Sequence, residues 1–355
     1  MGNFNTLINT VTIGASFMIG LLFLSAHFKN KKGNLFLGLF LWSLSYIQLS
    51  EIEGDNFLSK LETTFEIGLF ILVFLFFYLI RTINKPFKKW YWLLFIPGIL
   101  MNIVLFLNDN LSRDNDEMNI FKIFYLFDLV LVIYVFKILG NHKKKVNNYY
   151  SNIEQKTLTW LKSLIYFIIL LHASFILENI LPIENSNIIL LFNSFPSLII
   201  FTMVYWIGYN GFSQPEIFND VVDITKDKIK EIKQEDTLAK SQKEYDYLKE
   251  TIQEKRLYAK QNITLRDLAL SLEMKENRIS ALIKLHSKTT FYHFINRFRV
   301  EEFKKSMKST KSKQLSVFGL AQEVGFSSKS TFYSAFKAVE GMTPKQYEQT
   351  LKEFD

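Results

Sequence analysis

The chain has 355 residues, of which 49% are hydrophobic and 16% aromatic, and its formal net charge at pH 7 is +8. At about 150 residues per domain, this length predicts two or three domains. The sequence has no cysteine, which excludes disulfides, thiolate metal sites and a cysteine nucleophile. It also has no zinc-protease histidine pair, Walker A loop, dinucleotide-binding fingerprint or nucleophile elbow. We therefore expect no enzyme, no cofactor and no metal site.

The basic charge is concentrated at one end of the chain. Residues 251–355 contain 19 Lys and Arg against 11 Asp and Glu, so their formal charge equals the +8 of the whole chain. Such a basic module predicts a polyanionic partner, which is nucleic acid or an anionic membrane surface. Residues 1–210 are dominated by long apolar runs. We expect a membrane domain over 1–210, a linker over 211–243 and a basic domain over 244–355.

Seven apolar segments follow one another in the first 210 residues. Each has about the 20 residues that a helix needs to cross roughly 30 Å of hydrocarbon. They are 7–26, 34–52, 63–81, 90–108, 119–139, 161–181 and 187–207. No basic region precedes the first segment, so we interpret it as a retained span and not as a cleaved signal. The sequence predicts an all-α protein with a seven-span membrane domain, and a large soluble helical core is the less favoured alternative.

The loops between these segments differ in charge. Eleven Lys and Arg lie in the loops after the first, third and fifth segments, whereas two lie in the loops on the opposite side. Loops rich in Lys and Arg stay in the cytoplasm. We therefore expect a multi-pass protein of the cell inner (cytoplasmic) membrane, with the lipid bilayer as a partner. The N-terminus is expected outside and the C-terminal domain in the cytoplasm.

Asp128 and His172 lie near the middle of two predicted spans. An ionisable side chain at that depth costs about 2.5–3.5 kcal/mol on insertion scales, so such residues usually have a function. Their similar depths let the two side chains pair, while Glu66 and Glu178 lie nearer the outer face. One hypothesis is that the four line an outward-facing pocket for a small-molecule or membrane signal. The alternative is an Asp–His pair that only fixes helix packing.

The C-terminal domain contains an internal repeat. Thr264–Ala269 and Ser316–Ala321 each begin a short helix, and Leu-Ala recurs 52 positions later. After a short break, second helices are expected over Glu276–Ser287 and Ser328–Val339, with Gly325 ending the helix before the second break by a positive φ. A helix, a tight turn and a helix are the arrangement that presents its second helix to the major groove of DNA.

A longer helix is predicted between the two repeats, over Phe291–Met307. Its 17 residues span roughly 26 Å at 1.5 Å per residue. A rigid helix of that length holds two reading helices about one DNA turn apart. Upstream, the apolar residues between 222 and 252 indicate a loosely amphipathic helix, which is either a solvated spacer or the seam of a homodimer.

These motifs resemble the AraC/XylS-type DNA-binding domain, in which a long helix joins two helix-turn-helix units. The resemblance covers about residues 244–350, and it is carried by Gly325–Phe332, Phe336-Lys337, Gly341–Pro344, Tyr347 and Phe294–Arg299. The whole chain is similar to a bacterial subgroup that fuses this domain to a multi-pass membrane domain, with a Gln-Pro segment like 211–218 after the last span. Lys288 departs from the family pattern, which usually has Gly there.

The resemblance implies which residues contact DNA. The base-facing candidates are Lys329, Ser330, Tyr333 and Ser334 in the second unit, and Glu276, Asn277, Ser280 and Ala281 in the first. The candidate phosphate anchors are Lys284, Lys337, Arg297 and Lys345. The four positions of the second unit share one face of a helix, which agrees with this assignment. Arg299 is expected to be a structural partner inside the domain, and the phenylalanines of 291–336 are expected in its core.

The resemblance thus implies a membrane-anchored transcription regulator with double-stranded DNA as its partner. Two alternatives stay open from the residues themselves. One is a membrane receptor that signals through a protein partner docked on the C-terminal domain. The other is a transporter or channel with that domain as a regulatory tail.

Overall fold

The computed structural model describes residues 2–25, 31–50, 65–107, 116–154, 156–180, 186–214, 238–308 and 314–354. Over these residues the chain is α-helical, with one isolated β-bridge and no β-strand. The predicted all-α class is confirmed. The described residues fall into two compact units, one drawn from 1–139 and 158–219 and the other from 140–157 and 220–355. Most of the predicted linker 211–243 lies outside the described residues, and so do Val222, Ile229 and Ile232 of the candidate homodimer seam. The other two seam residues, Leu248 and Ile252, lie on a described helix and are buried in the core of the second unit.

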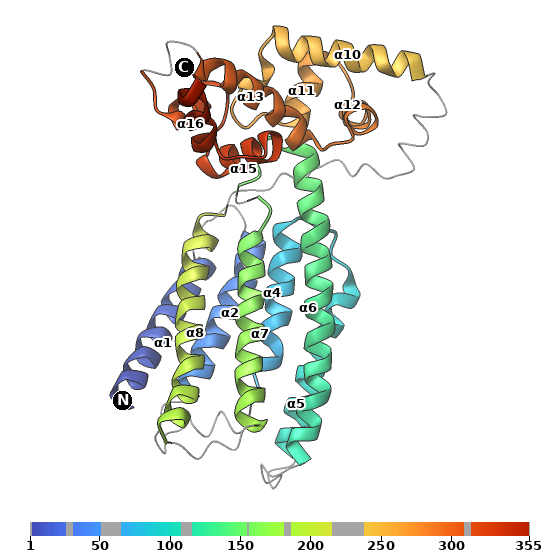
Figure 1. The fold of residues 1–355 in the computed structure, drawn as a ribbon. Helices are drawn as coiled ribbons and strands as arrows, with labels where there is room; N and C mark the ends of the chain where they lie inside the picture. Colours follow the sequence, from blue (N-terminus) through green and yellow to red (C-terminus); the bar gives the residue numbers. More distant parts are fainter. Residues whose placement is uncertain are drawn as a thin grey trace. The chain divides into compact units, whose positions relative to one another are not determined.

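The first unit is a bundle of long apolar helices. They are α1 (Gly2–Ser25), α2 (Lys31–Ser50), α4 (Gly68–Thr82), the 3₁₀ helix η1 (Lys89–Phe95) with α5 (Ile96–Leu107), most of α6 (Asp116–Tyr149), α7 (Thr159–Ile180) and α8 (Ser186–Phe212). Helix α1 packs along α2, α2 along α4, and α8 along both α1 and α7 (Figure 1). Each apolar segment predicted from the sequence is helical over most of its length.

Two stretches of this unit are long and apolar enough to cross a bilayer, Asn5–Ser25 and Lys89–Leu107. Three other apolar helices have 10–17 residues and fall short of that length: Gly33–Leu49, Gly68–Thr82 and Thr159–Ser174. The prediction of seven spans is therefore not confirmed within the described residues. For the third segment the reason is plain, because α4 begins at Gly68 and has 15 residues, whereas the sequence predicted a span from residue 63.

Helices of the first unit are apolar on their exposed sides as well as on their buried sides. The interior holds large buried rings such as Phe40, Phe76 and Phe77. On the exposed side, each of α1, α5 and α6 carries a series of large apolar residues, for example Phe17, Met18, Leu21, Leu22, Ile99, Leu100, Ile103, Phe106, Leu126, Leu129, Val130 and Ile133. A helix that is hydrophobic all round is typical of a protein core or of a membrane span.

The second unit contains two helix-turn-helix motifs joined by one helix. Its helices are α10 (Leu238–Glu254), η2 (Leu257–Ala259), α11 (Leu265–Leu272), α12 (Glu276–Leu282), η3 (Ile283–Ser287), α13 (Phe291–Met307), α14 (Val317–Glu323), α15 (Lys329–Glu340) and α16 (Pro344–Phe354). Helix α13 has the bounds that the sequence predicted. Its first half, with Phe291 and Ile295, packs in the core of the first motif, and its second half, with Val300 and Phe303, packs in the core of the second.

Side-chain caps explain where the motif helices begin. The Thr264 hydroxyl accepts a hydrogen bond from the Asp267 backbone N–H, and the Asp267 carboxylate accepts one from the Thr264 backbone N–H, which is a complete capping box. The Ser316 hydroxyl accepts a hydrogen bond from the Gly319 backbone N–H at the start of α14, and the Ser328 hydroxyl accepts one from the Thr331 backbone N–H at the start of α15. Each cap satisfies an N–H that the helix leaves unpaired and is worth about 1 kcal/mol.

The end of α6 and the residues after it belong to the second unit, although the sequence analysis assigned them to the first 210 residues. Val146, Tyr149 and Tyr150 are buried in the core of the first motif, together with Leu248 and Ile252 of α10. Tyr150 also forms the isolated antiparallel bridge with Thr264. This unit is therefore assembled from two stretches of the chain that lie far apart in the sequence.

Candidate nucleic-acid interface

Helix α15 separates its side chains cleanly between core and solvent. Thr331, Phe332, Ala335 and Phe336 are buried. The side chains predicted to face DNA bases or phosphates from this helix are all exposed: Lys329, Ser330, Tyr333, Ser334 and Lys337. Tyr333, the largest of them, is 41% exposed. The second motif therefore presents a continuous polar face on its second helix, as a reading helix must.

The chemistry of this exposed face suits DNA. The hydroxyls of Ser330, Tyr333 and Ser334 donate and accept hydrogen bonds, while Lys329 and Lys337 supply positive charge at its two ends. The Lys329 ammonium lies 5.6 Å from the centre of the Phe318 ring on α14. That contact holds the flexible lysine stem toward the first helix of its own motif.

The first motif presents less of its predicted face. Lys284 is exposed, and Glu276 and Asn277 are partly buried. Ser280 is only 8% exposed and Ala281 only 1%, so neither side chain is available to a base edge in this structure. The reason is that α12 packs against both α10 and α11. The implied base contacts of Ser280 and Ala281 are therefore not supported by the geometry.

Two polar contacts hold α10 against α12 and η3 of the first motif. The Arg278 guanidinium binds the Glu244 carboxylate at 2.7 Å. The His286 ring lies 3.2 Å from the Ser241 hydroxyl and stacks on the Tyr245 ring. Helix α10 is therefore part of this domain, and it packs against α12.

Lys288 adopts a backbone conformation that normally needs glycine. Its φ is +53°, in the left-handed region, directly after η3. Glycine enters this region at no steric cost, whereas a residue with a side chain is strained there by about 1–2 kcal/mol. Lys288 therefore occupies a strained left-handed turn at the position where the family pattern has glycine.

Arg299 is the buried polar centre of the unit, as the sequence predicted. The side chain is 0% exposed. Its guanidinium donates to the carbonyls of Tyr258 at 2.7 Å and Lys260 at 2.9 Å, to Asn296 Oδ1 at 3.0 Å and to Ser151 Oγ at 3.2 Å. Burial lowers the pKa of this group to about 10, so it stays charged at neutral pH. It ties α13 to η2 and to the segment after α6.

The comparisons with known proteins bear on this half of the chain. The sequence model of a helix-turn-helix domain family matches residues 268–350. These residues form a helix-turn-helix domain. The match supports the helix-turn-helix part of the resemblance, and with it double-stranded DNA binding and transcription regulation. Comparison with the curated proteins and with the solved structures gives no significant match.

Sequence reasoning missed three residues that contact the helix-turn-helix domain from outside it. Ser151, Asn152 and Glu154 follow α6 and form hydrogen bonds with residues 110 to 179 positions away. No motif marks them, since they stand in an ordinary polar loop after a lysine cluster. Only the folded structure brings them to the domain.

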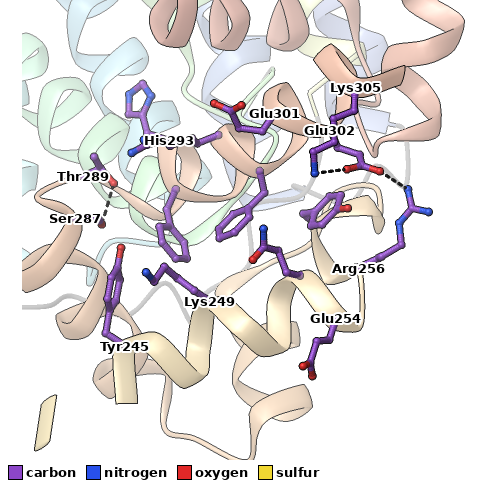
Figure 2. A pocket seen from close by; sticks show the side chains of 15 residues that line it. Tyr245, Lys249, Glu254, Arg256, Ser287, Thr289, His293, Glu301, Glu302 and Lys305 are labelled. Atoms are coloured by element: carbon purple, nitrogen blue, oxygen red, sulfur yellow. Dashed lines mark hydrogen bonds and ion pairs between the residues drawn. The ribbon is translucent and has the colours of Figure 1, made fainter. Parts of the chain in front are cut away.

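A pocket of about 780 Å³ lies between α10 and α13 of the same unit (Figure 2). Its lining contains both acidic and basic side chains, and Glu302 binds both Arg256 and Lys305 at 3.4 Å. Arg297, a candidate phosphate anchor, also lines this pocket, together with the carboxylates of Glu301 and Glu302. This mixture of charges makes the pocket a poorer site for a polyanion than the exposed face of α15.

In the first unit, the expected pairing of Asp128 with His172 is confirmed. His172 Nε2 lies 3.4 Å from Asp128 Oδ2, between α6 and α7, and Asp128 is buried. The other ring nitrogen lies 2.8 Å from the Ile168 carbonyl. Glu66 lies just before α4, and its carboxylate accepts a hydrogen bond from the Gly68 backbone N–H at 2.8 Å. The side chain of Glu178 lies outside the described residues.

Proposed function

We propose that this protein is a membrane-anchored transcription regulator that binds promoter DNA sequence-specifically and responds to a signal at or in the membrane. The observation that carries the proposal is the exposed polar face of α15 in a helix-turn-helix domain. Its hydroxyls and lysines are the groups that read base edges and bind phosphates. In the first motif, Asn277 and Lys284 are the DNA-contact candidates that the geometry retains.

Mutations distinguish the side chains that read the DNA sequence from those that bind any DNA. Changing Lys329 and Tyr333 together to Ala removes two candidate base contacts, each worth about 1–3 kcal/mol. Affinity for the preferred sequence should fall, while affinity for random DNA changes little. Changing Lys337 to Ala should instead weaken binding to all sequences alike and reduce the salt slope by about one. If the double variant loses the same factor on both kinds of DNA, its side chains do not read sequence.

The membrane part of the proposal is supported by the two helices of spanning length and by the apolar exposed faces of α1, α5 and α6. The charge bias of the loops supports the orientation. Reporter fusions after residues 32, 88 and 145 should report the cytoplasm, and fusions near 55, 114 and 185 the exterior. A cytoplasmic signal at residue 114 would contradict the proposed placement.

We propose the Asp128–His172 pair as the part of the first unit that senses the signal. A polar pair at this position costs desolvation of the buried Asp128 carboxyl that apolar residues would avoid, so it is weak evidence for stability alone. Asp128→Asn and His172→Gln should leave protein that is folded and inserted but whose promoter output no longer follows the stimulus. Equal losses of protein and of response would assign the pair to packing. Glu66 and Glu178 stay candidate members of the sensing site.

A receptor that signals through a protein partner docked on its C-terminal domain is the alternative function. The mixed charge of the α10–α13 pocket suits a protein surface better than DNA. Retention of DNA by the full chain in vesicles separates the two functions, since the alternative predicts no retention at 0.15 M salt beyond that of a lysine-rich control protein of equal charge.

A further inference from the structure

The loop that follows α6 lies between the two helix-turn-helix motifs. The Asn152 amide nitrogen donates to Asn262 Oδ1 at 2.9 Å, just before the first motif, and to Ser327 Oγ at 2.7 Å, in the turn of the second. The side-chain amide oxygen of Asn152 accepts a hydrogen bond from the Thr331 hydroxyl on α15 at 3.0 Å. One side chain of this loop therefore contacts the second motif, including its reading helix, and a residue just before the first motif.

The neighbouring Ser151 completes the buried polar centre. Its carbonyl accepts from the Asn296 amide at 3.0 Å, its hydroxyl accepts from Arg299, and its backbone N–H donates to the Ile263 carbonyl at 3.2 Å. Both Ser151 and Asn296 are almost fully buried. A buried amide without a partner costs about 1–3 kcal/mol. The loop is thus docked in a site built for it, and the contact is not an incidental surface touch.

Glu154 extends this docking to the exposed face of α15. Its carboxylate accepts a hydrogen bond from the Ser330 hydroxyl at 3.0 Å. Ser330 is the second residue of α15 and a candidate base contact. A hydroxyl has one proton to donate, so Ser330 cannot donate to Glu154 and to DNA at once. The carboxylate also places a negative charge where DNA phosphates approach.

We propose that Asn152 and Glu154, at the end of this loop, are an internal competitor of DNA: they are docked on the reading helix in the DNA-free state and displaced from it when DNA binds, while Tyr150 and Ser151 stay in the core of the domain. The inference rests on the proposed function and adds its regulation. Helix α6 is continuous from Asp116 to Tyr149, so the docked loop directly follows a helix of the first unit. A conformational change in α6 is therefore passed along the chain to Asn152 and Glu154, which contact α15.

The first test measures DNA affinity of the full chain in nanodiscs, on a genomic fragment selected by the wild type. Glu154→Gln keeps the shape of the side chain and removes its charge. We expect it to bind the fragment roughly threefold to tenfold more tightly, the size of one unfavourable charge contact near the surface. Glu250→Gln removes an equal charge from the exposed side of α10 and should change affinity less than twofold.

Unchanged affinity of the Glu154→Gln variant, or an equal gain from Glu250→Gln, would overturn the proposal. Failure of every variant and of the wild type to bind any fragment would instead remove the proposed function, and this inference with it. The two failures are therefore distinguishable.

The second test locks the loop in place. Because the chain has no cysteine, Asn152→Cys combined with Ser327→Cys forms a single cross-link between side chains that already touch. The oxidised protein, verified by mass, should bind the fragment at least tenfold more weakly than the same protein after reduction. Equal affinity of the two forms would overturn the proposal, since DNA would then bind with the loop still docked.

Discussion

Gly325 is the position where a single methyl group should disturb the second motif most. Its φ is +102°, outside the range that side chains adopt readily. A Cβ built there would lie 2.6 Å from the Tyr258 carbonyl oxygen and 2.8 Å from that of Ala259, both backbone atoms of η2. These atoms cannot move aside as a flexible side chain would, so the backbone of the second motif must shift away from η2.

The expected cost of Gly325→Ala has two parts. The positive φ costs about 1–2 kcal/mol, and the overlap with backbone costs roughly 1–3 kcal/mol more. Gly341→Ala is a matched control, because Gly341 has a φ of +76° but a Cβ there meets nothing within 4 Å. The control should therefore lose only the first part.

Hydrogen exchange followed by mass spectrometry on the full chain measures this difference. At 1.4 kcal/mol per factor of ten, Gly325→Ala should lower the protection of α14 and α15 roughly thirtyfold to a thousandfold or more, and Gly341→Ala roughly fivefold to thirtyfold. Equal losses from the two substitutions would refute the close approach of the second motif to η2.

Three further outcomes follow from the second unit. Burial lowers the pKa of His142 below its usual 6.5; a hydrogen bond to the Lys156 backbone raises this pKa, and the charge of Lys145 lowers it further. His142 therefore binds a proton more readily when its segment is undocked than when it is folded. Hydrogen-exchange protection of residues 146–154 should fall as the pH drops below about 6.5, but not in a His142→Gln variant. Arg299→Leu leaves two carbonyls and Asn296 without their donor, so the free energy of unfolding of the domain, measured by its resistance to protease, should fall by about 3 kcal/mol or more. Thr264→Val removes the capping box and should reduce exchange protection at the start of α11 by about 1 kcal/mol, with α15 unchanged.

The sequence predicted local structure well where the signal is local. The positive φ of Gly325, the start of α15 near Ser328 and the bounds of α13 all depend on residues within a few positions of one another. The phenylalanines at helical spacing, such as Phe332 and Phe336, marked the core for the same reason. Arg299 was expected to be a structural partner inside the domain, and it is fully buried there.

Other features depend on contacts between distant residues and could not be predicted. The docking of Ser151 and Asn152 joins residues more than 100 positions apart. The burial of Ser280 and Ala281 arises from the packing of α12 against α10 and α11, which helical periodicity does not contain. Ionisable residues at similar depths did predict the Asp128–His172 contact, but depth alone did not predict that the Glu66 carboxylate binds the first backbone N–H of α4.

The central claim is that the exposed face of α15 reads DNA sequence. The most direct measurement is capture of genomic fragments by the full chain in nanodiscs at about 0.15 M salt, with wild type and the Lys329→Ala, Tyr333→Ala double variant run in parallel. The wild type should enrich a small set of fragments at least a thousandfold over bulk DNA, as specific regulators do, and the double variant should lose that enrichment while retaining bulk DNA. Equal retention of all fragments by the wild type would contradict the claim.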